Sequence, residues 1–247
     1  MSEPRTAIVT GAARRVGAVI ARALVADGWR VIAHVHHDGD TVPDGCVRAV
    51  ADLAEPDCAD AIFAVANAMP PVRLLVNNAA RFAADRVDAV SAAEFDAHMA
   101  VNVRAPALLT QAFAQACDGA GEGDRGLIVN LLDAKLAAPN PDYLSYTLSK
   151  YALAGLTELS ARALAAKGIR VCGIAPALML QSPGQSAANF AAVHAQNPLR
   201  RGIDPDDVVA ALRYLIAARS VTGEVLTIDG GQRFLALDRD VQFLEIR

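Results

Sequence analysis

Short apolar runs alternate along the chain with longer segments in which apolar residues recur every three or four positions. A short apolar run is typical of a buried strand, and the longer period is typical of a helix with one face towards a core. The pattern predicts strands at Thr6–Thr10, Arg30–Val35, Val47–Ala51, Leu74–Asn77, Leu127–Leu132, Arg170–Ile174 and Val225–Ile228. It predicts helices at Val16–Ala26, Asp57–Ala68, Ala92–Ala116, Tyr143–Ala166 and Pro205–Ala217. Strand–helix alternation indicates parallel strands joined by right-handed crossovers, so we expect an α/β fold: a doubly wound parallel sheet with helices on both faces.

The length of the chain suits one α/β domain and is short for two, so we expect residues 1–247 to form a single domain. The glycine-rich stretch Cys117–Gly126, with the sequence CDGAGEGDRG, is predicted to be a surface loop. Residues Ala177–Leu199 form the only long irregular stretch that follows most of the predicted strands along the sequence. Long loops in such folds tend to act as lids, so we expect a substrate loop at about residues 177–200.

The composition is that of a chain with a sizeable core and no preference for nucleic acid or membranes. Hydrophobic residues make up 53% and charged residues 20% of the chain, and the formal net charge of −4 does not favour an anionic partner. The N-terminal sequence Met-Ser-Glu-Pro-Arg lacks the order of a signal peptide, and prolines interrupt the longest uncharged stretch, Val171–Leu199. Reduced thiols in a cytoplasmic protein are favoured over disulfides or zinc, because no CxxC spacing occurs among Cys46, Cys58, Cys117 and Cys172.

A glycine-containing turn follows the first predicted strand. Its sequence, Thr10-Gly11-Ala12-Ala13-Arg14-Arg15-Val16-Gly17, leads directly into a predicted helix. Such a turn lets backbone N–H groups and the helix N-terminus face a pyrophosphate. A strict GxGxxG is absent, and any tight strand–helix turn can use glycine, so this stretch alone leaves both interpretations open.

Polar residues at the ends of two further strands favour the nucleotide interpretation. Asp52 ends the third predicted strand, where it is placed to accept a hydrogen bond from an adenine amino group, and Asn77 and Asn78 end the fourth. Taken singly, Asp52 also fits a solvated turn, and the two asparagines fit a buried amide pair. The carboxyl ends of parallel strands meet at one edge of the sheet, where open α/β folds bind ligands, so together these residues predict a dinucleotide site.

The charges near the second strand favour NADPH over NADH. An NAD site places a carboxylate near the end of this strand to bind the ribose 2′-hydroxyl, but no acid appears there before Asp38. Arg14 and Arg15 add cations that suit a 2′-phosphate, although both also fit a solvent-facing turn. We expect no metal site, because no further His or Cys group is spaced to complete one. Three nearby histidines are interpreted as lining for the adenosine phosphate or as an exposed strand end: His34, His36 and His37.

A tyrosine and a lysine share one face of the helix predicted at residues 143–166. Tyr146 and Lys150 are four positions apart and are therefore neighbours on that face. A phenol titrates near pH ~10 when unperturbed, so a nearby cation helps it to exchange a proton near neutral pH. The YxxxK spacing is common by chance, but its position after the fifth strand, beside the expected cofactor edge, favours a proton-transfer pair.

These motifs together resemble those of the short-chain dehydrogenase/reductase family. The similarity rests on TGxxxxxG, Asp52, NNAA, Asn102 within Asn-Val-Arg-Ala-Pro, YxxxK and the closing Ile-Asp-Gly-Gly at residues 228–231, in the family's order along almost the whole chain. The resemblance implies a Rossmann-type fold with a seven-stranded sheet, Tyr146 and Lys150 as catalytic residues, and a catalytic Asn102 that bonds a water near Lys150. It implies a cofactor site made of Gly11, Arg14, Arg15, Val16, Gly17, His36, His37, Asp52, Leu53, Asn78, Ala79, Ala80, Tyr146, Lys150, Pro176 and Leu178.

Two departures from the family's usual pattern point to one of its branches. Asp133 stands thirteen positions before Tyr146, where the family usually has serine, and Arg15 replaces the middle glycine of the turn. Both departures resemble pteridine reductases, including dihydromonapterin- and dihydrofolate-reducing members, and Phe82 matches an aromatic residue of that branch. The resemblance implies that Asp133 is catalytic and that Phe82, Arg15 and Asp133 bind the substrate. The alternative is a divergent or inactive member, with Asp133 as a capping residue and Phe82 as a core ring.

The sequence therefore predicts an NADPH-dependent oxidoreductase that transfers hydride to a pterin- or dihydrofolate-like ring, with Tyr146 as the proton donor. One alternative is a carbonyl or 3-oxoacyl reductase of the same family. Another is a non-catalytic NADPH-binding sensor, which would not need the full set of Tyr146, Lys150 and Asn102. The expected partners are a small-molecule substrate and further copies of the chain, as a dimer or tetramer, because the helices at Ala92–Ala116 and Tyr143–Ala166 are rich in Ala and Leu.

Overall fold

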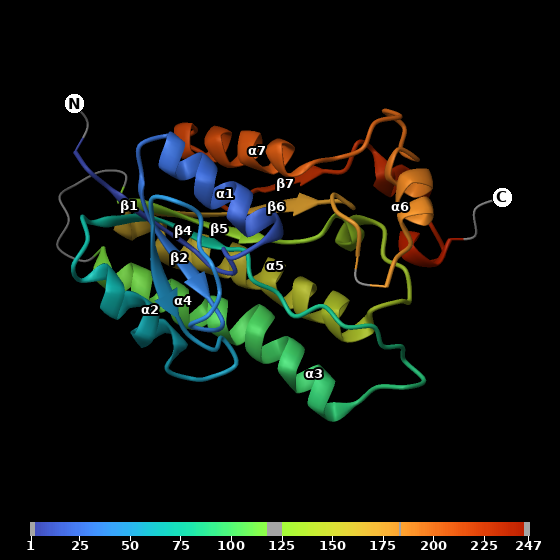
Figure 1. Cartoon of the computed structure of the whole chain (residues 1–247), viewed down its shortest axis with the longest axis horizontal. Coiled ribbons are helices and arrows are strands. Elements are labelled where there is room, and N and C mark those ends of the chain that lie inside the picture. The colour runs from blue at the N-terminus through green and yellow to red at the C-terminus, as the bar shows by residue number, and fades with distance from the viewer. Residues whose placement is uncertain (1–2, 118–124, 183, 245–247) are drawn as a thin grey trace.

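The computed structural model of the protein describes residues 3–117, 125–182 and 184–244. Its centre is a sheet of seven parallel strands in the order β3-β2-β1-β4-β5-β6-β7 (Figure 1). The strands are β1 (Thr6–Val9), β2 (Arg30–Val35), β3 (Cys46–Val50), β4 (Val72–Asn77), β5 (Gly126–Leu131), β6 (Ile169–Pro176) and β7 (Val225–Ile228). The predicted strands and the doubly wound, Rossmann-type arrangement are confirmed, and the predicted strand ends differ from those observed by at most two residues.

Helices cover both faces of the sheet. One face carries α1 (Arg15–Ala26) and α7 (Pro205–Ala217), which lie above the sheet in Figure 1; the other carries α2 (Cys58–Ala66), α4 (Ala105–Ala116) and α5 (Leu144–Leu164). Successive strand residues face opposite layers: Leu74 and Val76 pack with α1 and α7, and Leu75 between them packs with α2 and α4. Because these parallel strands are buried on both sides, their sequences are continuous apolar runs.

The helix predicted at Ala92–Ala116 is interrupted. Its first part, α3 (Ala92–Met99), is joined to α4 by a π-helical turn at Ala100–Arg104. Pro106 stands at the start of α4 and has no backbone N–H to donate to the preceding turn, which disturbs the α-helical hydrogen bonds there. The apolar spacing continues through the interruption, so the sequence pattern did not reveal it. The π turn contains the buried Asn102, and such turns often accompany functional sites.

The segment predicted as irregular at Ala177–Leu199 contains a helix, so that prediction is wrong in part. The helix α6 (Ala187–His194) begins after Ser186, whose hydroxyl oxygen accepts a hydrogen bond from the Asn189 N–H at 3.1 Å. Serine is a strong N-cap residue. This cap indicates the start of the helix, which the pattern of apolar residues did not show. The Asn189 side chain donates to the Leu244 carbonyl oxygen at 3.1 Å, so α6 is joined to the C-terminal part of the chain.

Residues 118–124 of the surface loop predicted at Cys117–Gly126 lie outside the described residues. In the described part of the chain, no helix is long and apolar enough to cross a membrane. The same residues contain no group of three or more His, Cys, Asp or Glu side chains arranged to hold a metal ion. None of the four cysteines forms a disulfide.

Candidate active site

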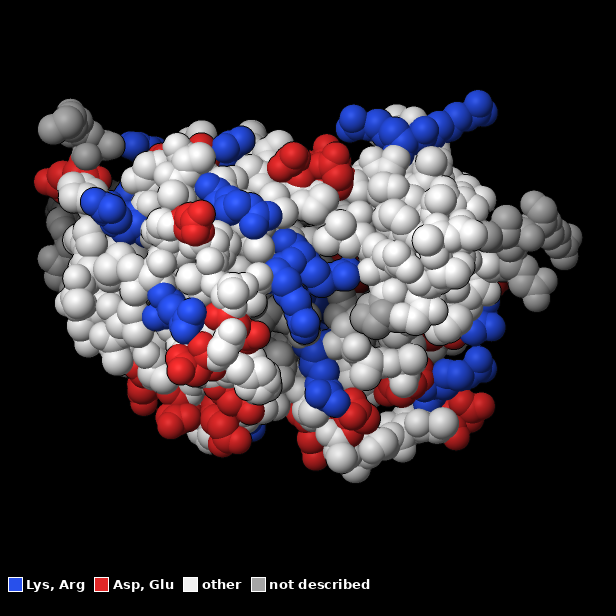
Figure 2. All heavy atoms as spheres, in the orientation of Figure 1, with Lys and Arg blue, Asp and Glu red and all other residues white. Residues whose placement is uncertain are grey.

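A cavity of about 1320 Å³ opens at the carboxyl edge of the sheet. Its walls are the turn after β1, the residues that follow β2 to β6, the start of α5 and part of the C-terminal segment. Figure 2 shows basic side chains gathered beside a hollow on this face, and the lining residues include Arg14, Arg15 and Arg81. Every residue predicted for the cofactor or substrate site lines this cavity, whereas the predicted catalytic Asn102 does not.

The turn after β1 is shaped for a close approach between its backbone and a phosphate group. Gly11 has a φ of +65°, and a Cβ atom on Gly17 would lie 2.2 Å from the Gly11 carbonyl oxygen, so both positions require glycine. The Asn78 side chain holds the turn by donating to the carbonyl oxygens of Thr10 at 2.8 Å and Gly11 at 3.2 Å. No side chain caps the start of α1, so its first N–H groups remain available. This turn fits the diphosphate of a dinucleotide.

The three histidines near the end of β2 do not share one role. His36 and His37 are exposed and stack with ring centroids 4.0 Å apart, and His36 Nε2 lies 3.4 Å from Asp52 Oδ2. His34 is only 3% exposed, and its ring nitrogens are hydrogen-bonded to the Gly11 N–H and the Ala51 carbonyl oxygen. The interpretation of His34 as part of an exposed strand end is therefore wrong, whereas its predicted place in the lining of the cavity agrees with the structure. Strand alternation turns it inward, while His36 and His37 lie beyond the strand.

Arg15 connects the turn to the predicted substrate loop. Its φ of +53° lies in the left-handed region, which is uncommon for a residue with a side chain. Its guanidinium donates to the carbonyl oxygens of Gln181 at 3.0 Å and Leu180 at 3.5 Å. The predicted contact of Arg15 with a substrate ring or a cofactor phosphate stays a prediction, and the structure adds that Arg15 holds the loop in place.

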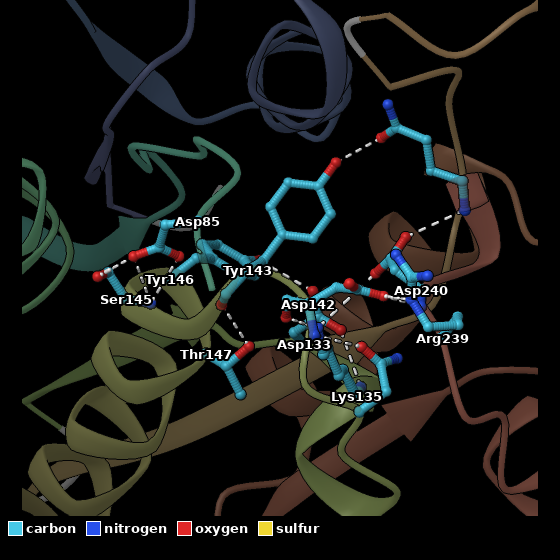
Figure 3. Close-up of polar contacts among 12 residues, drawn as sticks. Asp85, Asp133, Lys135, Asp142, Tyr143, Ser145, Tyr146, Thr147, Arg239 and Asp240 are labelled. Carbon is cyan, nitrogen blue, oxygen red and sulfur yellow. Dashed lines mark hydrogen bonds and ion pairs between the residues drawn. The ribbon is translucent and has the colours of Figure 1, made fainter. Parts of the chain in front are cut away.

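Tyr146, Lys150 and Asp133 meet at the end of β5. The Tyr146 hydroxyl donates to Asp133 Oδ2 at 2.9 Å (Figure 3). The Lys150 ammonium donates to the Leu131 carbonyl oxygen at 2.6 Å. Asp133 is held facing the tyrosine because its other oxygen, Oδ1, accepts from the Lys135 N–H at 2.8 Å. Asp133 thus caps a short 3₁₀ turn, as the alternative interpretation required, and it also contacts the predicted catalytic tyrosine.

Burial changes the proton affinities of the tyrosine and the lysine. Burial raises the pKa of Tyr146 well above its ordinary value of 10, and the charge of Asp133 and the hydrogen bond to it act in the same direction. Burial lowers the pKa of Lys150 to about 8, against the opposing effect of the Asp133 charge. In the cofactor-free protein, the tyrosine therefore keeps its proton at neutral pH while the lysine is a buried cation.

Replacing Lys150 with methionine is expected to stabilise the cofactor-free protein, because the folded state no longer buries a cation. The pKa of Lys150 is lowered from 10.5 to about 8 on folding, so the unfolded chain binds more protons between these values. The stabilisation should be on the order of 2–3 kcal/mol below pH 8 and should shrink as the pH rises towards 10.5. Urea unfolding of both proteins at pH 7 and pH 9.5 measures this difference; a variant less stable than the natural protein at pH 7 would contradict it.

Asn102 lies behind the cavity. Its amide nitrogen donates to the Ser149 hydroxyl oxygen at 2.8 Å and the Arg81 carbonyl oxygen at 3.0 Å, and its amide oxygen accepts from the Arg81 N–H at 2.7 Å. The Ser149 hydroxyl in turn donates to the Tyr146 carbonyl oxygen at 2.6 Å. Asn102 is 1% exposed, and these hydrogen bonds join it to α5 and to the segment after β4. Its predicted role in bonding a water near Lys150 stays a prediction.

An aromatic wall stands beside the tyrosine. Phe82 stacks on Tyr143 with ring centroids 4.3 Å apart and meets Tyr146 edge-on at 4.7 Å. Phe82 is 38% exposed and lines the cavity, so the alternative that it is a core ring is not supported. Tyr143 was not predicted as a site residue. Its φ of +56° places this bulky residue in the left-handed region just before α5, and only the fold reveals it.

The C-terminal segment folds over the start of α5, as Figure 3 shows. Arg239 donates to Asp142 Oδ2 at 2.7 Å, and the Tyr143 hydroxyl donates to Gln242 Oε1 at 2.6 Å. No local sequence pattern indicates these contacts, because they join residues about a hundred positions apart.

The C-terminal segment also places a second carboxylate, that of Asp240, near Tyr146 in the cavity. Asp240 lines the cavity with Leu237 and Val241, and its carboxylate lies 3.8 Å from the Lys135 ammonium. Burial raises the pKa of Asp240.

Comparison with known proteins adds to this geometry. The family model for enoyl-(acyl carrier protein) reductase matches residues 11–233. Pteridine reductase 1 of Leishmania tarentolae is 31% identical, over 91% of this chain and 95% of that protein. The 3beta-hydroxysteroid dehydrogenase 1 of Eggerthella lenta is 33% identical, over 92% of this chain and 93% of that protein. The crystal structure of FolM alternative dihydrofolate reductase 1 from Brucella canis, complexed with NADP, is 33% identical with a TM-score of 0.84, over 93% of this chain and 94% of that chain.

The fold, the glycine turn and the tyrosine–lysine pair define an oxidoreductase that uses a nicotinamide dinucleotide. The chain belongs to the short-chain dehydrogenase/reductase family, and it is similar to the pteridine reductase branch. Because the protein is an enzyme, the hypothesis of a non-catalytic sensor is not supported.

Proposed function

We propose that the protein is an NADPH-dependent reductase of a pterin- or dihydrofolate-like ring. The main support is the Asp133 carboxylate, hydrogen-bonded to the Tyr146 hydroxyl beside the exposed face of Phe82. One acid beside the substrate is enough for the reduction of a simple ketone. A second acid next to the tyrosine suits a ring nitrogen that must gain a proton when its neighbouring carbon is reduced.

NADPH is the proposed cofactor. The cavity presents Arg14, His36 and His37 at the ends of the turn and of β2, where a 2′-phosphate would bind. The FolM structure from Brucella canis is an NADP complex, which supports the same choice. Gly11 and Gly17 leave the space that the diphosphate requires.

The affinity for NADPH is expected to be at least tenfold higher than that for NADH, a difference of about 1.4 kcal/mol. One charge-assisted hydrogen bond from Arg14 to the 2′-phosphate is sufficient for this difference. Fluorescence titration of the purified protein with both cofactors measures it. Equal affinities, or tighter binding of NADH, would rule out the assignment.

When bound, NADPH supplies a hydride for the carbon of a C=N bond, and the adjoining nitrogen then needs a proton. We assign the donation of that proton to the Tyr146 hydroxyl. The buried ammonium of Lys150, 5.6 Å from the tyrosine ring, lowers the energy of the phenolate that remains. We assign to Asp133 the relay that returns a proton to Tyr146: its carboxylate takes a proton from solvent in the cavity and passes it to the phenolate along their hydrogen bond of 2.9 Å.

Phe82 is proposed to hold the flat substrate ring. Its 38% exposure at the cavity wall leaves a face available, while Tyr143 stacks behind it. Aromatic stacking contributes about 0.5–1.5 kcal/mol beyond simple burial, and a flat bicyclic ring uses this face more fully than a small ketone does.

A carbonyl reductase is the second candidate. It is favoured by the 33% identity to a hydroxysteroid dehydrogenase, which acts on a carbon bearing oxygen. A turnover screen with NADPH and 7,8-dihydropterin, 7,8-dihydrofolate, small ketones and a β-ketoacyl thioester separates the candidates. We expect the highest kcat/KM with one of the two ring substrates. If the thioester or a ketone is reduced fastest, the pteridine proposal fails and the carbonyl reductase remains.

We also propose that the enzyme is a cytoplasmic homo-oligomer. The helix α5 exposes a row of apolar side chains, with Leu148 43%, Tyr151 43% and Leu159 67% exposed, and faces of this kind commonly pack against a second copy. The absence of a disulfide among the four cysteines fits a reducing compartment.

The expected assembly is a dimer or tetramer at micromolar concentration, because burying these side chains between copies removes apolar surface from water. Multi-angle light scattering measures the mass in solution. A single species with the mass of one chain would refute the proposal.

A further inference from the structure

His34 is buried at the place where three strands end beside the cofactor cavity. It belongs to β2, is 3% exposed and borders the cavity. The backbone of His34 accepts a hydrogen bond from the Ala12 N–H at 2.9 Å. Its imidazole therefore lies against the turn that follows β1, on the side opposite to the Asn78 side chain, which reaches the turn from β4.

The contacts of the ring determine where its proton lies. Nε2 lies 3.0 Å from the Ala51 carbonyl oxygen, which can only accept, so Nε2 carries the hydrogen. Nδ1 lies 3.1 Å from the Gly11 nitrogen, whose N–H can only donate, so Nδ1 is the acceptor. Burial lowers the pKa of His34, which is the direction that a neutral ring requires.

The glycine of the turn is thus held from two sides. Its N–H donates to His34 Nδ1 at 3.1 Å, and its carbonyl oxygen accepts from Asn78 Nδ2 at 3.2 Å. Gly11 has a φ of +65° and little conformational restraint of its own, so these side chains define the orientation of both adjoining peptide groups.

The other end of the imidazole reaches the opposite wall of the cavity. Ala51 follows β3 and precedes Asp52, and both residues line the cavity. One rigid five-membered ring therefore spans the distance between the turn and the end of β3. A change in this ring would move the two walls relative to each other without touching Tyr146 or the substrate end.

We propose that His34 is a positioning residue for the cofactor: its neutral imidazole ties Gly11 to Ala51 and sets the spacing of the walls that bind the ADP half of the dinucleotide. This role does not depend on which substrate the enzyme reduces. The Gly11 N–H donates to His34, so it is not one of the N–H groups that bind the cofactor.

Two substitutions with amide side chains test the Gly11 contact and the Ala51 contact separately. In His34→Asn, the amide oxygen lies near the place of Nδ1 and can accept from the Gly11 N–H. In His34→Gln, the amide nitrogen lies near the place of Nε2 and can donate to Ala51, but Gly11 loses its acceptor. A buried N–H without a partner is costly, so the turn in the glutamine variant is expected to shift. His34→Phe keeps a ring of similar volume and lacks both polar atoms.

The test measures dissociation constants at pH 8, where the natural histidine is neutral. The two probes are NADPH and 2′-phosphoadenosine 5′-diphosphoribose, which lacks the nicotinamide. We expect the phenylalanine variant, which loses both contacts, to bind both probes about tenfold more weakly than the natural protein. The glutamine and asparagine variants each lose one contact and should fall between these two limits, with glutamine the weaker binder because it leaves the Gly11 N–H without an acceptor. At saturating NADPH, the KM for the substrate should be unchanged in all three.

Melting temperatures without cofactor distinguish positioning from general support of the fold. Equal dissociation constants in all four proteins, with only the melting temperature lowered, would overturn the proposal. It would also be overturned if asparagine weakened binding as much as phenylalanine does, because the acceptor for Gly11 would then be irrelevant. If the glutamine variant does not fold, the comparison of asparagine with phenylalanine carries the test.

Discussion

Tyr146→Phe is expected to lower kcat by about a thousandfold while leaving the dissociation constant of NADPH within a factor of two or three. The variant keeps the ring that meets Phe82 edge-on and removes only the hydroxyl that donates to Asp133. Since that hydroxyl is the proposed proton donor, its loss affects the chemical step more than the binding of the cofactor. Single-turnover kinetics with saturating NADPH and a fluorescence titration measure the two quantities.

Tyr151→Phe is the matched control on the same helix. Its hydroxyl donates to the Leu136 carbonyl oxygen at 3.1 Å, and the residue is 43% exposed and away from the cavity lining. We expect this variant to retain the natural rate. If Tyr146→Phe also retained most of its rate with the preferred substrate, the phenol would not be the acid.

Asp133→Ala is expected to slow the reduction of a dihydropteridine by about a hundredfold, the scale of one lost general acid. The carboxylate is the hydrogen-bond partner of Tyr146 at 2.9 Å, and no other described side chain accepts from that hydroxyl. Steady-state kinetics with NADPH and the substrate that wins the screen measure the effect. A loss of less than about threefold would contradict a role in proton transfer.

Asp133→Asn separates the chemistry from the structural role of this residue. Asp133 also caps a 3₁₀ turn by accepting from the Lys135 N–H, which an asparagine oxygen can do as well. We expect the asparagine variant to be as stable as the natural protein and as slow as the alanine variant. A fast asparagine variant would show that a polar group, rather than an acid, is sufficient at this position.

The parts of the site that the sequence predicted share one physical property. Gly11, Asp52, Asn78 and Asp133 all lie one or two residues beyond the end of a strand, and parallel strands bring such positions to one edge of the sheet. The helical period likewise places Tyr146 and Lys150 on one face. The local sequence was sufficient to predict these residues, because the parallel sheet brings the ends of its strands together wherever they lie in the sequence.

The parts that the sequence did not predict depend on contacts between distant residues. Arg239 contacts Asp142, and Gln242 contacts Tyr143, although the partners lie about a hundred positions apart along the chain. His34 was grouped with two exposed neighbours, because its burial depends on how β1 and β3 flank β2. Backbone strain at Tyr143 is likewise invisible in a pattern of apolar and polar positions.

The most direct test of the proposed function is the ratio of kcat/KM for a dihydropteridine to kcat/KM for a small ketone, measured in the natural enzyme and in Asp133→Ser. Serine restores the residue that the family usually has here and removes the second acid beside Tyr146. We predict a ratio above one in the natural enzyme and a ratio at least tenfold lower in the serine variant, because only the ring substrate uses the carboxyl group. A ratio below one in the natural enzyme, or faster dihydropteridine reduction by the serine variant, would contradict the proposed function.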